Sequence, residues 1–295
     1  MSFEDLPPQT PIYPAEAQDY ADTALALSRE AVREVEAHMD QPYGSDYWQK
    51  VDVFCPKARP AQPLPVLVFA HGGAWTHGYK EWMGLMAPVF TATPAVFVSV
   101  SYRLAPQHRH PTSLLDCIAA LAWVHRNVAG FGGDPDRISV GGHSAGGHLY
   151  ALATLRGDLL AQAGLPVDVV KACFPISSQL NLVFDKPAPG SGEERIYTMY
   201  LRDAADAPSA SPLHLLEGNR VPFLLAYGEH DFPRIARSNV EMGQALERQG
   251  VAHDVICLDG YDHFDTALSL GRPGSELVGR LRHWLCGDFV TGTLT

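Results

Sequence analysis

The stretch RISVGGHSAGGHLYAL, residues 137–152, passes from a strand pattern to a helical pattern within a few residues. The β-branched run that ends at Val140 is typical of a short buried strand, and the small and apolar residues from Ala145 onward are typical of a helix start. Ser144 lies at the apex of the turn between them, inside a G-x-S-x-G pattern whose two glycines remove side chains that would collide in so sharp a turn. The strand–turn–helix context predicts an exposed nucleophilic serine, and the alternative is a glycine-rich turn with an incidental serine.

The composition is that of an ordinary globular protein, with 46% hydrophobic and 19% charged residues. We expect one α/β domain over residues 1–295. A net charge of −11 with acidic residues spread along the chain disfavours nucleic acid or an anionic membrane as a partner. No apolar run approaches the roughly 18 residues of a membrane span, residues 1–14 lack a signal-peptide pattern, and the five cysteines form no CxxC pair. The sequence predicts a cytoplasmic protein with reduced thiols, and it carries no signal for the oligomeric state.

Apolar runs alternate with helical patterns along most of the chain. The predicted strands are 48–54, 64–70, 95–102, 138–142, 167–174, 222–228 and 253–260, and the predicted helices are 15–38, 80–90, 112–128, 145–157, 233–249 and 275–286. Strand, helix and strand at this spacing imply right-handed crossovers. We therefore expect a mostly parallel sheet with helices on both faces.

Residues 179–218 break this alternation, because they mix proline, glycine and serine with a short helical piece. An insertion at the carboxyl edge of a parallel sheet is where a lid over a pocket would lie, and the alternative is a surface excursion without substrate contact. The N-terminal helical segment, about 15–40, would pack beside the insertion and complete the lid. The aromatic residues Phe184, Tyr197 and Tyr200 of the insertion are candidate pocket residues.

A serine nucleophile needs hydrogen-bond donors for the oxyanion that forms when it attacks a carbonyl. The motif HGGAW, residues 71–75, directly follows a predicted buried strand, and its glycines allow backbone N–H groups to face an empty space. We expect the N–H of Ala145 to act there with those of Gly73 and Ala74, or with that of Gly72. The alternative is a plain strand-ending turn.

The nucleophile also needs a base and an acid that orients the base. Asp231, in GEHD at the end of a predicted strand, is the candidate acid; Glu229 is its rival, and a helix-capping role is the alternative. His263, in YDHF after the last predicted strand, is the candidate base. His143 and His148 flank the serine, but we expect them to point elsewhere. The order serine, acid, histidine along the chain is that of α/β-hydrolases.

Five ordered motifs together resemble the α/β-hydrolase superfamily over about residues 50–285. They are HGGAW, SYRLAPQHRHP (101–111), GGDPDRISVGGHSAGGHL (132–149), GEHD and YDHF. The resemblance is to the HGG-carrying esterases, namely the hormone-sensitive-lipase-like and carboxylesterase group, and to the related kynurenine formamidases. It implies an α/β-hydrolase fold with a small lid insertion, the triad Ser144, Asp231 and His263, and the oxyanion donors Gly73, Ala74 and Ala145.

Two positions in HGGAW depart from one group or the other. Ala74 stands where the lipase-like group usually has a third glycine, whereas the formamidases often have an aromatic residue there, followed by a tryptophan that Trp75 matches. Trp75 is also a candidate pocket residue. The sequence predicts a serine hydrolase that cleaves carboxylic esters of small or aromatic substrates through an acyl-enzyme. The alternatives are an arylformamidase that hydrolyses amides such as N-formylkynurenine, and a hydrolase-fold protein that binds a small molecule without catalysis.

The proposed chemistry requires no cofactor. The sequence contains neither HExxH nor a set of cysteines and histidines with metal-ligand spacing, so we expect no metal site.

Overall fold

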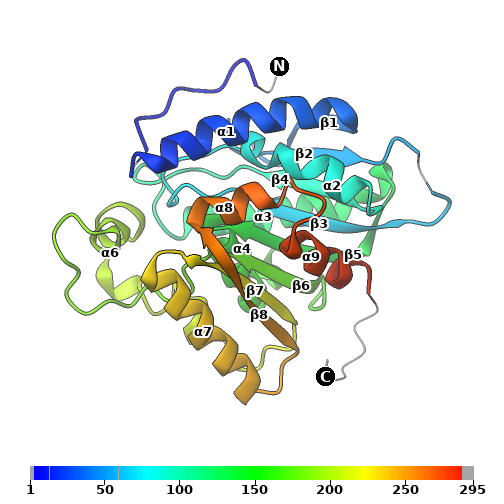
Figure 1. Cartoon of the computed structure of the whole chain (residues 1–295). Coiled ribbons are helices and arrows are strands. Elements are labelled where there is room, and N and C mark those ends of the chain that lie inside the picture. The colour runs from blue at the N-terminus through cyan, green and yellow to red at the C-terminus, as the bar shows by residue number, and fades with distance from the viewer. Residues whose placement is uncertain (1–2, 13, 59, 288–295) are drawn as a thin grey trace.

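The computed structural model describes residues 3–12, 14–58 and 60–287. A sheet of eight strands runs through the middle of the protein (Figure 1). The strands are β1 Glu36–Pro42, β2 Lys50–Cys55, β3 Leu64–Ala70, β4 Val96–Val100, β5 Gly133–His143, β6 Val170–Ile176, β7 Phe223–His230 and β8 His253–Asp262. Their order is β1-β2-β4-β3-β5-β6-β7-β8. In this spatial order, all neighbouring strands from β4 through β3 to β8 pair in parallel. Strand β2 pairs antiparallel with both of its neighbours, β1 and β4. The predicted mostly parallel sheet is confirmed.

Helices cover both faces of this sheet (Figure 1). They are α1 Glu16–Ala31, α2 Ala87–Thr91, α3 Thr112–Asn127, α4 Ala145–Leu155, α5 Gly157–Gln162, α6 Gly192–Arg195, α7 Pro233–Arg248, α8 His263–Ser269 and α9 Glu276–Cys286. One hydrophobic core contains residues of α3, α4, α5 and α7, and the other contains residues of α1, α2, α8 and α9. None of the helices among the described residues combines the length and the apolar content that a membrane crossing requires.

Strand β3 shows why the central strands are continuous apolar runs. Val66 and Val68 belong to one core, and Leu67 and Phe69 belong to the other, because successive side chains point to opposite faces of a sheet. All four side chains are fully buried. A strand with helices on both sides therefore has no polar face.

The N-terminal segment differs from the prediction of one helix over 15–38. The helix α1 ends at Ala31, a 3-10 turn follows at Val32–Glu34, and β1 begins at Glu36. Strand β1 forms the edge of the sheet and pairs only with β2. An edge strand keeps polar residues toward solvent, so its sequence lacks the apolar run by which the inner strands were recognised.

The other differences concern short elements. The predicted helix 80–90 is a 3-10 helix, Lys80–Met86, continued by α2, and the helices α5 and α8 were not predicted. A turn with Gly132 at φ 84° directly precedes β5, which begins at Gly133. The insertion between β6 and β7 projects beside the sheet edge and carries α6 and several single-turn helices (Figure 1).

Candidate active site

Ser144 occupies a sharp turn between β5 and α4. Its backbone has φ 52° and ψ −116°, a strained conformation for a residue with a side chain. The turn is held because the N–H of Ser144 donates to the carbonyl of Ile176 at 2.8 Å. The next turn of the chain also passes close to β3, since a Cβ atom on Gly146 would collide with the carbonyl of Ala70. The glycine at 146 is therefore required by this packing.

The carboxyl ends of three parallel strands bring the predicted nucleophile, base and acid together. Ser144 follows β5, Asp231 follows β7, and His263 follows β8 as the first residue of α8. The Nε2 atom of His263 lies 3.0 Å from Ser144 Oγ, and its Nδ1 atom lies 2.9 Å from Asp231 Oδ1. The three side chains thus form one continuous line of hydrogen bonds.

The surroundings of Asp231 keep its carboxylate ionised. Its side chain is fully buried, and burial alone would raise its pKa, but the hydrogen bond and the electrostatic attraction to His263 bring the pKa below its ordinary value. The N–H of Phe232 also donates to Asp231 Oδ1 at 2.7 Å. An ionised carboxylate accepts a hydrogen bond from the Nδ1–H group of the ring, which leaves Nε2 free to accept the hydroxyl proton of Ser144. The rival acid Glu229 is exposed and accepts a hydrogen bond from the N–H of Gly260 instead.

The HGGAW segment forms a tight turn directly after β3. Gly73, Ala74 and Trp75 have φ values of 108°, 50° and 61°, so three consecutive residues adopt the left-handed region. The carbonyl of Gly73 accepts the N–H groups of Thr76 and His77 at 3.0 and 2.9 Å, which closes the turn.

Three of the four predicted oxyanion donors lie around Ser144. Gly73 and Ala74 line the same cavity as Ser144, and Ala145 is the first residue of α4. In the hydrogen bonds found among the described residues, the N–H groups of these three residues take no part. Gly72 does not line the cavity, and its carbonyl accepts a hydrogen bond from His71 Nδ1 at 2.6 Å.

The cavity over Ser144 and His263 has a volume of about 330 Å³. Its walls come from distant parts of the chain, including the N-terminal segment with α1, the HGGAW turn, the insertion and the start of α7. Its aromatic lining residues are Tyr20, Trp75, Trp82, Phe232 and Phe264. A small cavity with aromatic side chains next to the serine suits an apolar group of modest size.

Only one of the four candidate pocket residues lines this cavity. Trp75 does, whereas Phe184, Tyr197 and Tyr200 do not. The ring of Tyr200 stacks on Trp75 with centroids 4.4 Å apart, and the hydroxyl of Tyr197 accepts the N–H of Phe184 at 2.8 Å. These aromatic residues pack against the protein core, so the expectation that they line the cavity is wrong.

The sequence interpretation missed several cavity residues. Phe232 and Phe264 directly follow the predicted acid and base, so their positions offered a signal. Tyr20 and Trp82 offered none, because they reach the cavity only through the packing of α1 against the 3-10 helix Lys80–Met86. Tyr20 stacks on Phe264 with centroids 5.4 Å apart.

The two histidines beside the serine have different roles. The expectation that His143 points away from the serine is wrong, because His143 lines the cavity. Its Nε2–H donates to the carbonyl of His263 at 2.9 Å. His143 therefore helps to position the candidate base. His148 points away from the serine: its Nδ1 accepts from Trp75 Nε1 at 3.1 Å, and its Nε2–H donates to the carbonyl of Ala210 in the insertion at 2.8 Å.

The free energy of unfolding should fall as the pH is lowered from about 6.5 to 4. Burial lowers the pKa of His143 and His148 to about 3, and that of His71 to about 4, so the folded protein keeps them neutral. The unfolded chain protonates them near pH 6.5 and therefore binds more protons over this range. Asp52 acts in the opposite direction, because burial raises its pKa to about 7, and it offsets one histidine.

Each net proton changes the free energy of unfolding by roughly 1.4 kcal/mol per pH unit. Urea unfolding midpoints at pH 7, 5.5 and 4.5 measure the effect. An unchanged or rising stability toward pH 4.5 would contradict the neutral, buried state of these histidines.

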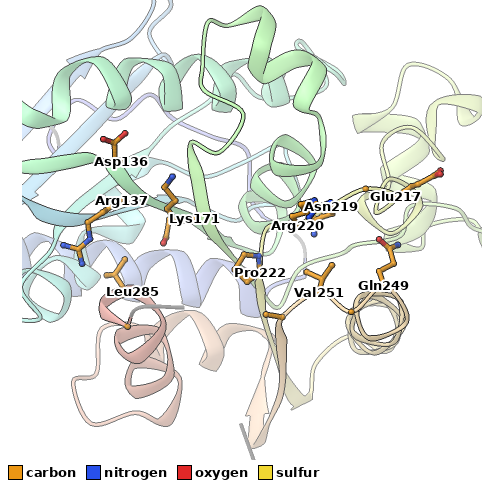
Figure 2. Close-up of a pocket in the computed structure, with 15 residues that line it drawn as sticks. Asp136, Arg137, Lys171, Glu217, Asn219, Arg220, Pro222, Gln249, Val251 and Leu285 are labelled. Carbon is orange, nitrogen blue, oxygen red and sulfur yellow. The ribbon is translucent and has the colours of Figure 1, made fainter. Parts of the chain in front are cut away.

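A larger cavity of about 1110 Å³ lies at the opposite, amino ends of the strands (Figure 2). None of Ser144, Asp231 and His263 lines it. Its basic residues are Arg137, Lys171 and Arg220. The two arginines lie well apart in Figure 2 and do not point toward a common spot. In the part of the chain that the structure describes, no three His, Cys, Asp or Glu side chains lie together as a metal site would require.

A protein-family model described as an alpha/beta hydrolase fold matches residues 67–265. This range contains the HGGAW turn, the serine turn, Asp231 and His263. The chain belongs to the α/β-hydrolase fold family. The resemblance inferred from the five motifs is confirmed at this level.

Several members of the family are similar to this chain over much of its length. Esterase LipC from Mycobacterium tuberculosis is 37% identical over 241 residues, which cover 74% of this chain and 60% of that protein. Carboxylesterase NlhH from the same species is 35% identical over 172 residues, which cover 57% of this chain and 52% of that protein. The chain thus spans only about half to three-fifths of these relatives.

Solved structures of the family share the fold. A hyperthermophilic esterase from the archaeon Pyrobaculum calidifontis is 25% identical to this chain, with a TM-score of 0.71. The match covers 94% of this chain and 98% of that chain. The α/β-hydrolase fold predicted from the sequence therefore extends over almost the whole chain.

Proposed function

We propose that this α/β-hydrolase is a carboxylic ester hydrolase that uses Ser144 as its nucleophile. The observation that carries the proposal is the line of hydrogen bonds from Asp231 through His263 to Ser144, which ends in a cavity. The similarity to proteins named esterase and carboxylesterase supports the same reaction class.

In the first half of the reaction, Ser144 Oγ attacks the ester carbonyl while His263 Nε2 takes the hydroxyl proton. The ionised Asp231 stabilises the imidazolium that forms. Negative charge develops on the carbonyl oxygen, and the N–H groups of Gly73, Ala74 and Ala145 are the donors that would stabilise it. One such donor typically lowers the barrier by roughly 2.7–4 kcal/mol.

The tetrahedral intermediate then collapses, the bond to the alcohol oxygen breaks, and His263 returns its proton to that oxygen. The alcohol leaves, and the acyl group remains on Ser144. In the second half, His263 takes a proton from a water molecule that attacks the acyl-enzyme, and the acid is released with Ser144 restored. No step requires a metal or an organic cofactor.

The walls of the cavity support a small or aromatic ester as substrate. Its volume of about 330 Å³ is at the lower end of the usual range for ligand sites. The insertion and the N-terminal segment both contribute residues to its lining, for example Ile12 and Met199. We propose that these two segments form the lid of the site.

Trp75 is the residue of the HGGAW motif that matches the arylformamidases. Its indole N–H is occupied by His148, and its ring is stacked on Tyr200. Packing therefore accounts for the tryptophan without any role in recognising an amide. The proposed activity is therefore ester hydrolysis, and formamide hydrolysis measured in the same assay tests the alternative.

The test compares kcat/KM for p-nitrophenyl esters of two to ten acyl carbons with kcat/KM for N-formylkynurenine. We expect kcat/KM for short esters to exceed kcat/KM for the ten-carbon ester by about 10-fold or more, because a confined pocket excludes a long chain. A formamide preference of about 100-fold, or roughly 2.7 kcal/mol of transition-state discrimination, would assign the protein to the arylformamidases. Absence of turnover with every substrate would favour a binding protein without catalysis.

A further inference from the structure

The cavity over Ser144 has an uneven distribution of charge. Two arginines, Arg195 and Arg234, line it, and no aspartate or glutamate is found among its described lining residues. The chain as a whole carries a net charge of −11, so a cavity with only cationic fixed charges is unlike its surface. Arg195 ends α6 in the insertion, and Arg234 lies in the first turn of α7. Two separate elements thus place guanidinium groups at one cavity.

Arg234 lacks the partners that a largely buried arginine usually has. Its Nε atom is buried without a hydrogen-bond partner among the described residues, and no carboxylate in that part of the chain lies within ion-pair distance of its guanidinium group. The group lies 4.8 Å from the centroid of the Phe232 ring. An arginine can donate five hydrogen bonds, so the cation–π contact leaves its donors available.

Two acidic groups attract Arg234 without forming an ion pair with it. Burial lowers the pKa of Arg234 from its ordinary value, while Glu193 and Asp231 attract it and act in the opposite direction. Asp231 already accepts hydrogen bonds from His263 and the N–H of Phe232. A guanidinium group remains protonated at neutral pH, so Arg234 presents a positive charge that forms no direct ion pair among the described residues. Such a charge in a partly desolvated position costs free energy that a bound anion would recover.

We propose that Arg234, together with Arg195, forms a carboxylate-binding subsite within the cavity. Preferred substrates would then be esters that carry a free carboxylate on an aromatic ring or short chain, away from the ester bond that is cleaved. The planar guanidinium fork matches a carboxylate with two parallel hydrogen bonds, and Phe232 and Phe264 offer apolar walls beside it. The inference rests on the proposed ester hydrolysis and narrows its substrate class.

The subsite should act mainly on binding. The carboxylate keeps its charge throughout the reaction, so Arg234 would bind the substrate and the transition state about equally. Loss of such an interaction raises KM and leaves kcat less affected. A purely structural role for Arg234 would instead change the hydrolysis of charged and neutral esters by the same factor.

The experiment uses matched pairs of charged and neutral esters. One pair carries the charge on the leaving group, 4-acetoxybenzoate against 4-acetoxybenzamide, and the other carries it on the acyl group, mono-p-nitrophenyl glutarate against p-nitrophenyl pentanoate. The readout is the ratio of kcat/KM, charged over neutral, in the wild type and in Arg234→Gln, Arg195→Gln and Arg237→Gln. Arg237 lies one turn along α7, is exposed and does not line the cavity, so it is the matched control.

We expect the charged ester of at least one pair to be preferred in the wild type. The ratio should fall about 10- to 100-fold in Arg234→Gln, as for loss of a hydrogen bond to a charged group, and should stay unchanged in Arg237→Gln. Inhibition by benzoate and benzamide provides a measurement on the wild type alone, in case a variant fails to fold. Benzoate should inhibit hydrolysis of p-nitrophenyl butyrate at least about 10-fold more strongly than benzamide.

Three results would overturn parts of this account, and they are distinguishable. Equal or better hydrolysis of the neutral esters, with benzoate no better than benzamide, would reject the subsite and leave the ester hydrolase standing. A charge preference that survives in both Arg234→Gln and Arg195→Gln would reject the assignment to these arginines. Failure to hydrolyse any ester would reject the proposed function itself.

Discussion

Replacing Ser144 with alanine should lower kcat/KM for any ester substrate by about 10⁴-fold or more while the protein stays folded. The substitution removes only Oγ, whose hydrogen bond is to His263 Nε2 at 3.0 Å. The backbone hydrogen bond from Ser144 to Ile176 does not depend on the side chain. Without a nucleophile, only binding and the oxyanion donors would remain to promote attack by water.

The control for this variant is Ser139→Ala. Ser139 is a buried serine in β5, the strand that ends directly before Ser144, but it lies outside the cavity that contains Ser144. Its variant should keep wild-type kcat/KM within a few-fold. The unfolding midpoint of both variants shows whether the fold is retained. Near wild-type turnover by Ser144→Ala would remove this residue as the nucleophile.

Replacing Asp231 with asparagine should lower kcat by about 10³- to 10⁴-fold. The two side chains have nearly the same shape, but an amide has no negative charge to stabilise the imidazolium of His263. Its NH₂ group can also donate to Nδ1, which favours the tautomer that carries the proton on Nε2. In that tautomer His263 cannot accept the proton of Ser144.

The exposed rival Glu229 provides the matched control, since Glu229→Gln makes the same chemical change two residues away. We expect Glu229→Gln to retain activity within about 3-fold, because this carboxylate contacts the N–H of Gly260 and lies away from His263. Measured kcat values for both variants decide between the two acids. A greater loss in Glu229→Gln than in Asp231→Asn would show that the acid is misassigned.

The positions of the predicted nucleophile, acid, base and oxyanion turn could be inferred from sequence because each has a local signature. HGGAW, the serine turn, Asp231 and His263 all directly follow strands of the sheet, and the carboxyl ends of parallel strands lie at one edge of the sheet. The geometry of the serine turn also requires glycine at close approaches, as at Gly146, and this leaves a visible pattern. Local chemistry and sheet topology thus carried this part of the prediction.

The lining of the cavity could not be inferred in the same way. Tyr20 and Trp82 reach it through the packing of α1 on a distant 3-10 helix, and no pattern near either residue indicates that contact. The aromatic residues of the insertion have the composition of pocket residues, but Tyr200 instead stacks on Trp75 and does not line the cavity. Edge strand β1 was missed because its polar residues resemble the end of a helix. Long-range packing decides these features.

The most direct test of the account is covalent labelling with diethyl p-nitrophenyl phosphate, followed by mass spectrometry of the digested protein. An activated serine attacks the phosphorus, releases p-nitrophenol and retains the diethyl phosphoryl group. We expect one label per chain on the peptide that contains Ser144, loss of esterase activity in proportion to labelling, and no label in Ser144→Ala. A label on another residue, or inhibition that persists in Ser144→Ala, would contradict the assignment of Ser144 as the nucleophile.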